Sequence, residues 1–298
     1  MDMDACGAHR WVTAESNRRA LIDMARDLEP FGIELLAIKG IYMVYELDVD
    51  AIRRPLQDAD AIVARGSFDQ AISVLTACGR WTPGSGWSSK AVSRKRGLGG
   101  TVDLHRTPLP LFFGAMRSAA LHSRARRSEA FERRVFVPDA EDAACIALAH
   151  FVKDAVSVSR VVRTIDDLRQ LGERADVTPQ SVARRLGDHG LRLVGLVAFA
   201  ALEREDKGWR YWSDHLAPSG GERWVANELV DVLRSQLAHH PDLAHLLVRS
   251  LADTGLRRAG GMSAAGLRLL RDRVLMLRAR PGKQWFRVRS STESAGRF

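Results

Sequence analysis

Cysteine is scarce in this chain of 298 residues, which holds only Cys6, Cys78 and Cys145. Their odd number and wide spacing exclude a disulfide framework and argue against a zinc site built on paired cysteines. Free cysteines are typical of proteins in a reducing compartment, so we expect a cytoplasmic location.

Hydrophobic runs are short, and one common nucleotide-binding motif is missing. No apolar run approaches the roughly 18 residues that a membrane-spanning helix needs, so we expect no contact with membranes. The pattern G-x-x-x-x-G-K-[ST] is absent, which excludes a P-loop enzyme. With 46% hydrophobic and 27% charged residues, the composition still predicts a folded protein and not a long disordered chain.

Excess positive charge is confined to the last part of the chain. The formal net charge is +9, and residues 249–298 alone hold 12 basic and 3 acidic residues, so the first 248 residues are neutral overall. A basic segment attracts nucleic acid, an acidic peptide or a polyphosphate. The alternative is a solvated helix face in a protein whose basic residues are mostly arginine.

The first part of the sequence mixes helical and strand patterns. Short apolar segments between turn residues predict buried strands, and apolar residues at helical spacing predict helices. The strands are expected at residues 33–38, 58–63 and 101–105, and the helices at 11–28, 41–47 and 68–77. Ser67 is expected to cap the last of these helices and Gly79 to end it. Segment 83–100, rich in Gly, Ser, Lys and Arg, indicates a loop or a hairpin.

Beyond Pro138 only helical patterns remain. They cover residues 139–152, 159–172, 179–188, 191–203, 222–237 and 267–278. The fold class is therefore predicted to be α+β. We expect a mixed β-sheet with flanking helices in residues 1–138, then an all-helical domain in residues 139–298 that ends in the basic segment.

Three aspartates are the main candidates for chemistry. Asp58 and Asp60 are two apart, so on a strand both carboxylates project from the same face. Asp103 lies on another expected strand and joins them if that strand is adjacent. Three carboxylates with bound Mg²⁺ form the usual protein part of a two-metal phosphoryl-transfer site. For an isolated Asp-x-Asp, the alternative is a solvated strand end or turn.

Two cationic positions near these aspartates suit phosphate. Lys39-Gly40 follows an expected strand and opens a helix, where a glycine lets phosphate approach the backbone and Lys39 adds a cation. Arg54, four residues before Asp58, is a second candidate for neutralising phosphate charge. A plain strand-to-helix turn is the alternative for Lys39-Gly40.

Three further residues are candidates for contacting the nucleotide. His105 shares a strand face with Asp103, where it is suited to contact phosphate or to shuttle a proton; the alternative is a packed, hydrogen-bonded histidine. Lys153 and Asp167 lie on expected helices and line a nucleotide cleft if the helical domain closes over the sheet. The alternative for both is a surface position.

The segments that carry these residues resemble a known family, the bacterial nucleotidyltransferases of the polymerase-beta superfamily. The similar segments are Ala-Ile-Lys-Gly at 37–40, Arg-Pro-Leu-Gln-Asp-Ala-Asp at 54–60, Val-Asp-Leu-His at 102–105, Ala-His at 149–150 and Ile-Asp-Asp-Leu at 165–168. Two features depart from the pattern. Ala59 stands where Ile or Leu is common, and Lys39-Gly40 replaces the superfamily's usual glycine-serine pair.

The resemblance implies a nucleotidyltransferase-type sheet and the transfer of a nucleotide from NTP to an acceptor hydroxyl. It implies that Asp58, Asp60 and Asp103 bind Mg²⁺ and that Asp103 also activates the acceptor. Related branches include the toxin halves of toxin–antitoxin and abortive-infection systems, so a cognate inhibitor protein is a candidate partner.

Three functions remain open at this point. The first is nucleotidyl transfer, with an RNA or tRNA end or a protein or peptide hydroxyl as acceptor. The second is a kinase-like reaction that transfers phosphate with the same metals. The third is a non-catalytic protein that uses the fold to bind RNA or a partner, and the intact set of three carboxylates argues against it.

Overall fold

A mixed β-sheet of seven strands organises the first part of the molecule, with the strand order β3-β4-β5-β2-β1-β7-β6. The structure is a computed structural model, and it describes residues 5–83, 90–95, 100–109, 116–154 and 158–235. The strands are β1 (Leu35–Ile38), β2 (Ala59–Val63), β3 (Trp81–Pro83), β4 (Lys90–Lys95), β5 (Thr101–His105), β6 (Arg126–Arg127) and β7 (Phe136–Val137).

The register of the central strands brings the two aspartate motifs together. Strand β2 pairs antiparallel with β1 and parallel with β5, and both pairings involve Asp60. Ile38 of β1 lies opposite Asp60, and Asp60 lies opposite Asp103 of β5. The strand at 101–105 is therefore adjacent to the strand at 59–63, as the sequence analysis required for the carboxylates to meet.

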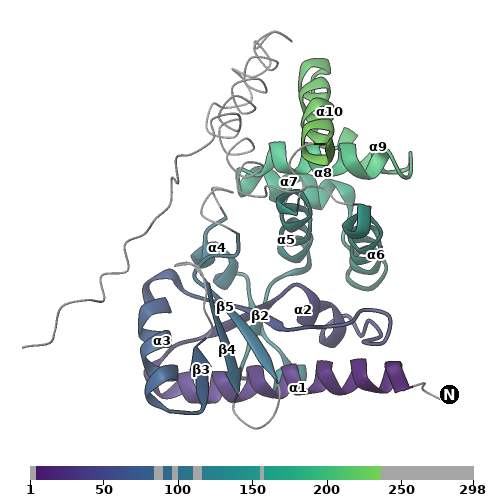
Figure 1. The fold of residues 1–298 in the computed structure, drawn as a ribbon. Helices are drawn as coiled ribbons and strands as arrows, with labels where there is room; N and C mark the ends of the chain where they lie inside the picture. Colours follow the sequence, from purple (N-terminus) through teal and green to yellow (C-terminus); the bar gives the residue numbers. More distant parts are fainter. Residues whose placement is uncertain (1–4, 84–89, 96–99, 110–115, 155–157, 236–298) are drawn as a thin grey trace, which may run out of the picture. The chain divides into compact units, whose positions relative to one another are not determined.

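Helices and short turns cover this sheet. They are α1 (Ala5–Leu28), α2 (Gly40–Tyr45), α3 (Phe68–Ala77) and α4 (Ser118–His122), with 3₁₀ turns at Glu29–Phe31, Arg65–Ser67 and Glu129–Phe131. Helix α1 runs across the sheet, in contact with β2, β5 and α3 (Figure 1). Its Leu21, Met24 and Leu28 are fully buried, as are all four residues of β1. Burial of these apolar side chains fixes the sheet that carries the aspartates.

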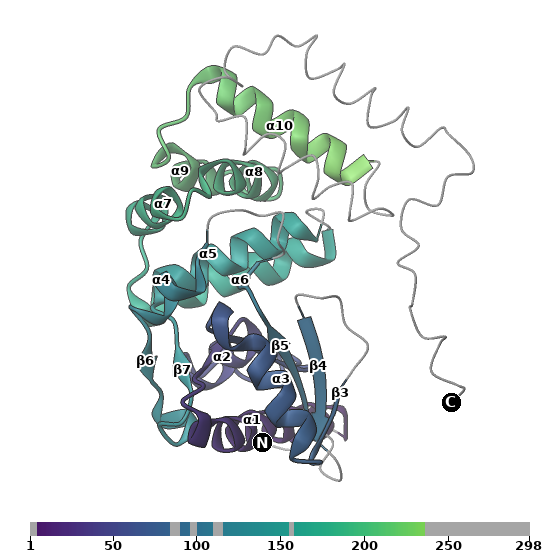
Figure 2. The ribbon, with the colours of Figure 1, turned by 90° about the vertical axis from the view of Figure 1, so that its left-hand side faces the viewer.

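From Ala140 to Ser235 the described residues contain helices and no strand. The helices are α5 (Ala140–Lys153), α6 (Val158–Ala175), α7 (Pro179–Asp188), α8 (Arg192–Glu203), α9 (Trp209–Asp214) and α10 (Gly220–Ser235). In Figure 2 they follow one another away from the sheet, with α5 and α6 nearest to it. Helix α8 is the centre of this group, because residues 193–202 are all buried and it contacts α5, α7, α9 and α10.

Local capping explains where two of these helices begin. The Asp139 side chain accepts a hydrogen bond from the backbone N–H of Asp142 and so starts α5 directly after β7. Thr178 and Ser181 form a reciprocal capping box at the start of α7. All described residues belong to one compact unit, and the change from sheet to helices after Val137 occurs within it. The division into two domains at residue 138 stays a prediction.

The structure confirms some of the sequence predictions about local elements and corrects others. Segment 83–100 includes a true strand, since β3 and β4 form an antiparallel pair, which agrees with the hairpin alternative. Asp58 precedes β2 and is not part of it. Ser67 stands at the start of α3 but makes no capping hydrogen bond with its side chain. Gly79 follows α3 with a φ of +69°, as a helix-ending glycine should.

The sequence analysis also missed the two-residue strands β6 and β7 and the short helices α4 and α9, which are too short to produce a clear apolar pattern. The predicted helix at 267–278 and the basic segment 249–298 lie outside the described residues. No helix in the described part of the chain combines the length and apolar character that crossing a membrane requires.

Candidate active site

Asp60, Asp103 and His105 form a compact cluster at the centre of the sheet. One ligand atom from each lies within 4.8 Å of the others, and Asp103 is buried. Parallel pairing of β2 with β5 places the two aspartates opposite one another, and His105 lies two residues beyond Asp103 on β5. Residues two apart on a strand share a face, so the cluster follows directly from the register.

Asp60 is the most strongly held member of the cluster. Its Oδ1 atom lies 2.5 Å from Lys39 Nζ and 2.8 Å from His105 Nε2. Burial alone opposes ionisation of Asp60, but the Lys39 ammonium and the hydrogen bond from His105 outweigh it and hold the pKa of Asp60 well below its usual range. Asp60 is therefore a carboxylate anion at neutral pH, and Lys39 occupies the position of a cation beside it.

Lys39 has an unusual backbone. Its φ of +61° and ψ of −129° place a residue with a side chain in a region that L-residues rarely adopt. Such strain persists where the surrounding structure enforces it, and it is concentrated at functional sites. The turn between β1 and α2 therefore directs Lys39 toward Asp60 at an energetic cost.

Gly40 has a packing role that the sequence analysis did not foresee. A Cβ atom added at Gly40 would lie 2.5 Å from Cδ2 of Leu56, so a side chain there would displace Leu56. Helix α2 has only six residues, so its N-terminus carries little of the phosphate-binding argument made from the sequence.

Arg54 lies against α6 and pairs there with Asp167. Arg54 Nη2 is 3.0 Å from Asp167 Oδ2, and only 10% of the Arg54 side chain is exposed. Burial lowers the pKa of Arg54, although Asp167 opposes this change. Burial also raises the pKa of Asp167 to about 6, even though Arg54 and Arg163 act in the opposite direction. The two predicted nucleotide-binding residues thus contact each other.

Helix α5 contributes Lys153 and a histidine that the sequence analysis did not select. Lys153 Nζ is 3.7 Å from Asp154 Oδ1. His150 Nε2 lies 3.1 Å from the carbonyl oxygen of Pro108, which can only accept, so this nitrogen carries the proton. Burial, followed by the charges of Lys39 and Lys153, holds the pKa of His150 well below its usual value. His150 is therefore neutral and lies within electrostatic range of the cluster.

The spacing of His150 and Lys153 was the signal that could have identified this histidine. Residues three apart share a helix face, so a helix that brings Lys153 to the site also brings His150 there.

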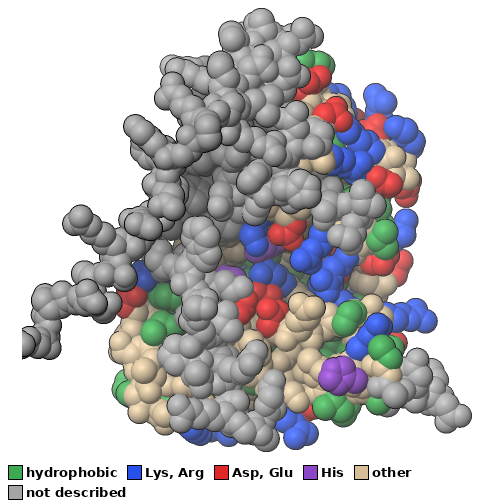
Figure 3. All heavy atoms as spheres, in the orientation of Figure 1, with side chains coloured by type: hydrophobic (Ala, Val, Ile, Leu, Met, Phe, Trp, Pro, Cys, Tyr) green, Lys and Arg blue, Asp and Glu red, His purple; other side chains and the backbone are tan. Residues whose placement is uncertain are grey.

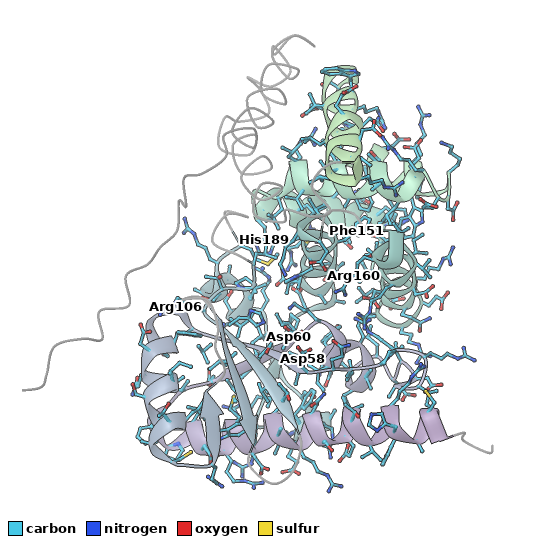
Figure 4. All side chains as sticks on the ribbon, in the orientation of Figure 1. Asp58, Asp60, Arg106, Phe151, Arg160 and His189 are labelled. Carbon is cyan, nitrogen blue, oxygen red and sulfur yellow. The ribbon has the colours of Figure 1, made fainter. Side chains whose placement is uncertain are left out.

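Asp58 is placed less closely than predicted. It is partly exposed in the bend before β2, and among the described residues it is not a member of the cluster formed by Asp60, Asp103 and His105. Figure 4 shows Asp58 and Asp60 at the same end of β2. The structure therefore brings Asp60, Asp103, His105 and Lys39 together and leaves Asp58 beside them.

The donor atoms of the cluster fit a divalent metal. Two carboxylates supply the hard oxygen ligands that Mg²⁺ prefers, and an imidazole nitrogen is a ligand that first-row transition metals such as Mn²⁺ or Zn²⁺ also accept. The short contact between Asp60 and the Lys39 ammonium shows that this position already holds a positive charge.

Comparisons with known proteins identify the family but no characterised relative. No curated protein and no solved structure matches the chain. The sequence model of a family described as "Uncharacterised nucleotidyltransferase" matches residues 8–202. The matched region runs from α1 to α8 and includes every residue of the site described above. It also covers more than half of the chain, which therefore belongs to this family of uncharacterised nucleotidyltransferases.

Proposed function

We propose that the protein transfers a nucleotide from an NTP to an acceptor hydroxyl in a Mg²⁺-dependent reaction. The observation that carries the proposal is the alignment of Asp60 with Asp103 on neighbouring parallel strands, with His105 in the same cluster. Membership of a nucleotidyltransferase family supports nucleotide transfer in general. The metal, the nucleotide and the acceptor belong to the proposal.

In this proposal Asp60 and Asp103 hold the metal, and Asp58 completes the carboxylate set. Bound Mg²⁺ would neutralise phosphate charge and favour ionisation of the acceptor hydroxyl. Asp103 is the group proposed to accept the proton of that hydroxyl. His105, whose Nε2 donates to Asp60, orients the Asp60 carboxylate, and in its doubly protonated form it would also donate from Nδ1 to a phosphate oxygen.

Basic side chains beside the cluster support the binding of a triphosphate. Lys39 contacts Asp60 directly, and Arg54 lies near enough for the Asp60 charge to affect its pKa. On the face shown in Figure 3, Lys and Arg side chains gather where α5 and α6 approach the sheet. We assign the triphosphate to Lys39 and Arg54, with Lys153 from α5 as a further cation.

The acceptor is proposed to be an RNA end, such as that of a tRNA. The support is the net charge of +9 in residues 249–298, which would supply non-specific affinity for phosphate. A protein or peptide hydroxyl is the alternative acceptor, and it becomes the favoured one if RNA is not labelled. A cognate inhibitor protein, as in toxin–antitoxin systems, stays a prediction from the resemblance.

The test is product analysis with NTP labelled at the α- or γ-phosphate. We expect α-label, and not γ-label, to enter RNA in the presence of Mg²⁺ and to be lost in EDTA. Asp60→Asn should lose this activity, whereas Asp166→Asn, which changes an exposed carboxylate on α6, should retain it. Transfer of γ-label would contradict the proposal and indicate a kinase-like reaction. Normal turnover of the Asp60→Asn variant would contradict the proposed role of Asp60 in metal binding.

A further inference from the structure

Arg54 is incompletely paired for a buried cation. Its Nη2 atom contacts Asp167, but its Nε and Nη1 atoms are buried and have no hydrogen-bond partner among the described residues. A guanidinium group has five N–H donors, and buried donors are nearly always satisfied. In a guanidinium group Nε and Nη1 each form a planar two-donor fork with Nη2, as Arg124 shows with the two oxygens of Asp142, so an anion bound through either fork of Arg54 would take Nη2 from Asp167.

The cations around Arg54 favour the binding of a further anion, although Arg160 also pairs with Asp154 at 3.3 Å. On α6, Arg160 and Arg163 are close enough to disfavour the charged form of Arg54. Asp167 is the carboxylate in contact with Arg54, while Asp166 on the same helix is 64% exposed. Arg163 donates to the carbonyl oxygen of Pro55, next to Arg54, so α6 and the segment before β2 are in direct contact.

We propose that a polyphosphate anion, bound through Nη2 together with Nε or Nη1, replaces Asp167 as the counter-ion of Arg54, and that the Asp167 carboxylate then takes up a proton from solvent. The assignment of this anion to the triphosphate of an NTP rests on the proposed function. The replacement of Asp167 as the counter-ion of Arg54 requires only a polyphosphate anion, with or without a nucleotide attached.

The physical reason is the balance between burial and attraction at Asp167. A buried carboxylate remains ionised only while an opposite charge compensates for its lost hydration. Arg54 supplies that charge, and even so burial raises the pKa of Asp167 to about 6. When phosphate oxygens neutralise Arg54, the compensation weakens, so the pKa of Asp167 rises further.

The charged groups that face Asp167 favour the same outcome. Arg54, from the segment before β2, and Arg163, from α6, are the cations that stabilise its anion, and Asp166 destabilises it. A polyphosphate bound among Arg54, Arg160 and Arg163 would screen both cations at once. Asp167 is therefore the group whose protonation the anion changes most.

The proton should be detectable by calorimetry. Tripolyphosphate, without nucleotide or metal, is titrated into the full chain at pH 7 in two buffers that differ in ionisation enthalpy. We expect the wild-type protein to take up at least about half a proton more per ligand than Asp167→Asn. The difference between the two proteins cancels the titration of tripolyphosphate itself.

Matched variants distinguish binding through the paired N–H donors of Arg54 from binding by its positive charge alone. Asp166→Asn removes a neighbouring exposed carboxylate from the same helix and should take up protons as the wild type does. Arg54→Gln should weaken tripolyphosphate binding about tenfold or more, because it loses charge-assisted hydrogen bonds. Arg54→Lys keeps the charge but loses the fork, so it should also weaken binding.

A second measurement applies if Asp167→Asn does not fold. Isotope-edited infrared difference spectra of the wild-type protein, with labelled aspartate, should gain a protonated-carboxyl band when tripolyphosphate binds. Equal proton uptake by wild type and Asp167→Asn, or the absence of that band, would overturn the proposal. Because tripolyphosphate carries no nucleotide to transfer, a failure of the nucleotidyl-transfer assay leaves these outcomes unaffected.

Discussion

Asp142 and Asp167 are both buried carboxylates on helices, but their surroundings differ. Asp142 accepts hydrogen bonds from Arg124 at 2.9 and 3.0 Å, lies 2.7 Å from His189 Nε2 and pairs with Arg185 at 2.9 Å. These partners outweigh the effect of burial and lower the pKa of Asp142. Asp167 has Arg54 as its contacting cation, and burial raises its pKa to about 6.

The comparison separates a structural role from a functional one. The Asp142 cluster connects α5 with α7 and with the turn that follows α4, and it leaves the Asp142 carboxylate fully compensated, so it needs no ligand. The Asp167 pair leaves two donors of Arg54 unsatisfied next to the candidate active site. Strongly perturbed groups with incomplete partners are more often found at binding sites than in purely structural networks.

The largest expected effect is the loss of activity on changing Asp60. This carboxylate has strong partners, as Asp142 does, but it belongs to the cluster with Asp103 and His105. Asp60→Asn should reduce nucleotidyl transfer by about 10³-fold or more, because metal binding contributes several kcal/mol to such reactions. Single-turnover assays with labelled NTP measure the loss, and circular dichroism confirms folding. If the folded variant kept its rate, Asp60 would have a structural role, as Asp142 does.

The next effect is on stability. Asp142→Asn should lower the free energy of unfolding by about 3 kcal/mol, since it removes the buried anion of Arg124 and Arg185 and leaves them only the more exposed Asp139. Urea denaturation measures this change. Asp167→Asn should cost less, because burial already disfavours its ionised form. If Asp142→Asn lost less stability than Asp167→Asn, the structural role assigned to Asp142 would be wrong.

The two carboxylates should also respond to pH with opposite sign. The pKa of Asp167 rises from 3.8 to about 6 on folding, so the native state binds more protons between these values. Its contribution to stability is therefore present at low pH and lost as pH rises through this window, by about 3 kcal/mol. The pKa of Asp142 is lowered, so its contribution is lost as pH falls.

Urea denaturation of the wild type and Asp167→Asn between pH 4 and 7 tests this sign. The stability of the wild type relative to the variant should decrease with rising pH. A difference that is constant with pH would show that folding does not shift the pKa of Asp167.

The smallest expected effect concerns the strained backbone of Lys39. Lys39→Ala and Lys39→Gly remove the same ammonium, so both should weaken NTP binding equally. Glycine adopts positive φ freely, so Lys39→Gly should be more stable than Lys39→Ala by about 1 kcal/mol. Equal thermal stability of the two variants would show that the turn is not strained.

Much of the sheet was predictable because its strands are short apolar segments between turn residues. The positions of β1, β2 and β5 and the neighbouring placement of Asp60 and Asp103 agree with the sequence analysis. Asp58 was assigned to a strand because an Asp-x-Asp pattern does not show where the strand begins. The roles of these residues in catalysis stay predictions.

Long-range side-chain pairs could not be predicted in the same way. Arg54 and Asp167 are far apart in sequence, and no local pattern specifies that α6 packs against the segment before β2. The same holds for His150, whose protonation depends on Lys39 and Lys153 and on a carbonyl oxygen at Pro108. Such contacts depend on tertiary packing, which apolar periodicity does not encode.

Helix α5 is held by salt bridges at its first turn and carries Lys153 at its other end. Asp142, in its first turn, is anchored to α7 and to the turn after α4, while Lys153, in its last turn, is near enough to His150 for its charge to lower the pKa of that histidine. Eleven residues separate them, which is about 16 Å along a helix. A tilt of only about 3–4° at the anchor would therefore shift Lys153 by about 1 Å, and displacements of that size can reduce catalysis about 10²-fold. If Lys153 binds the triphosphate as proposed, its placement depends on the stiffness of a salt-bridge cluster at the opposite end of the helix.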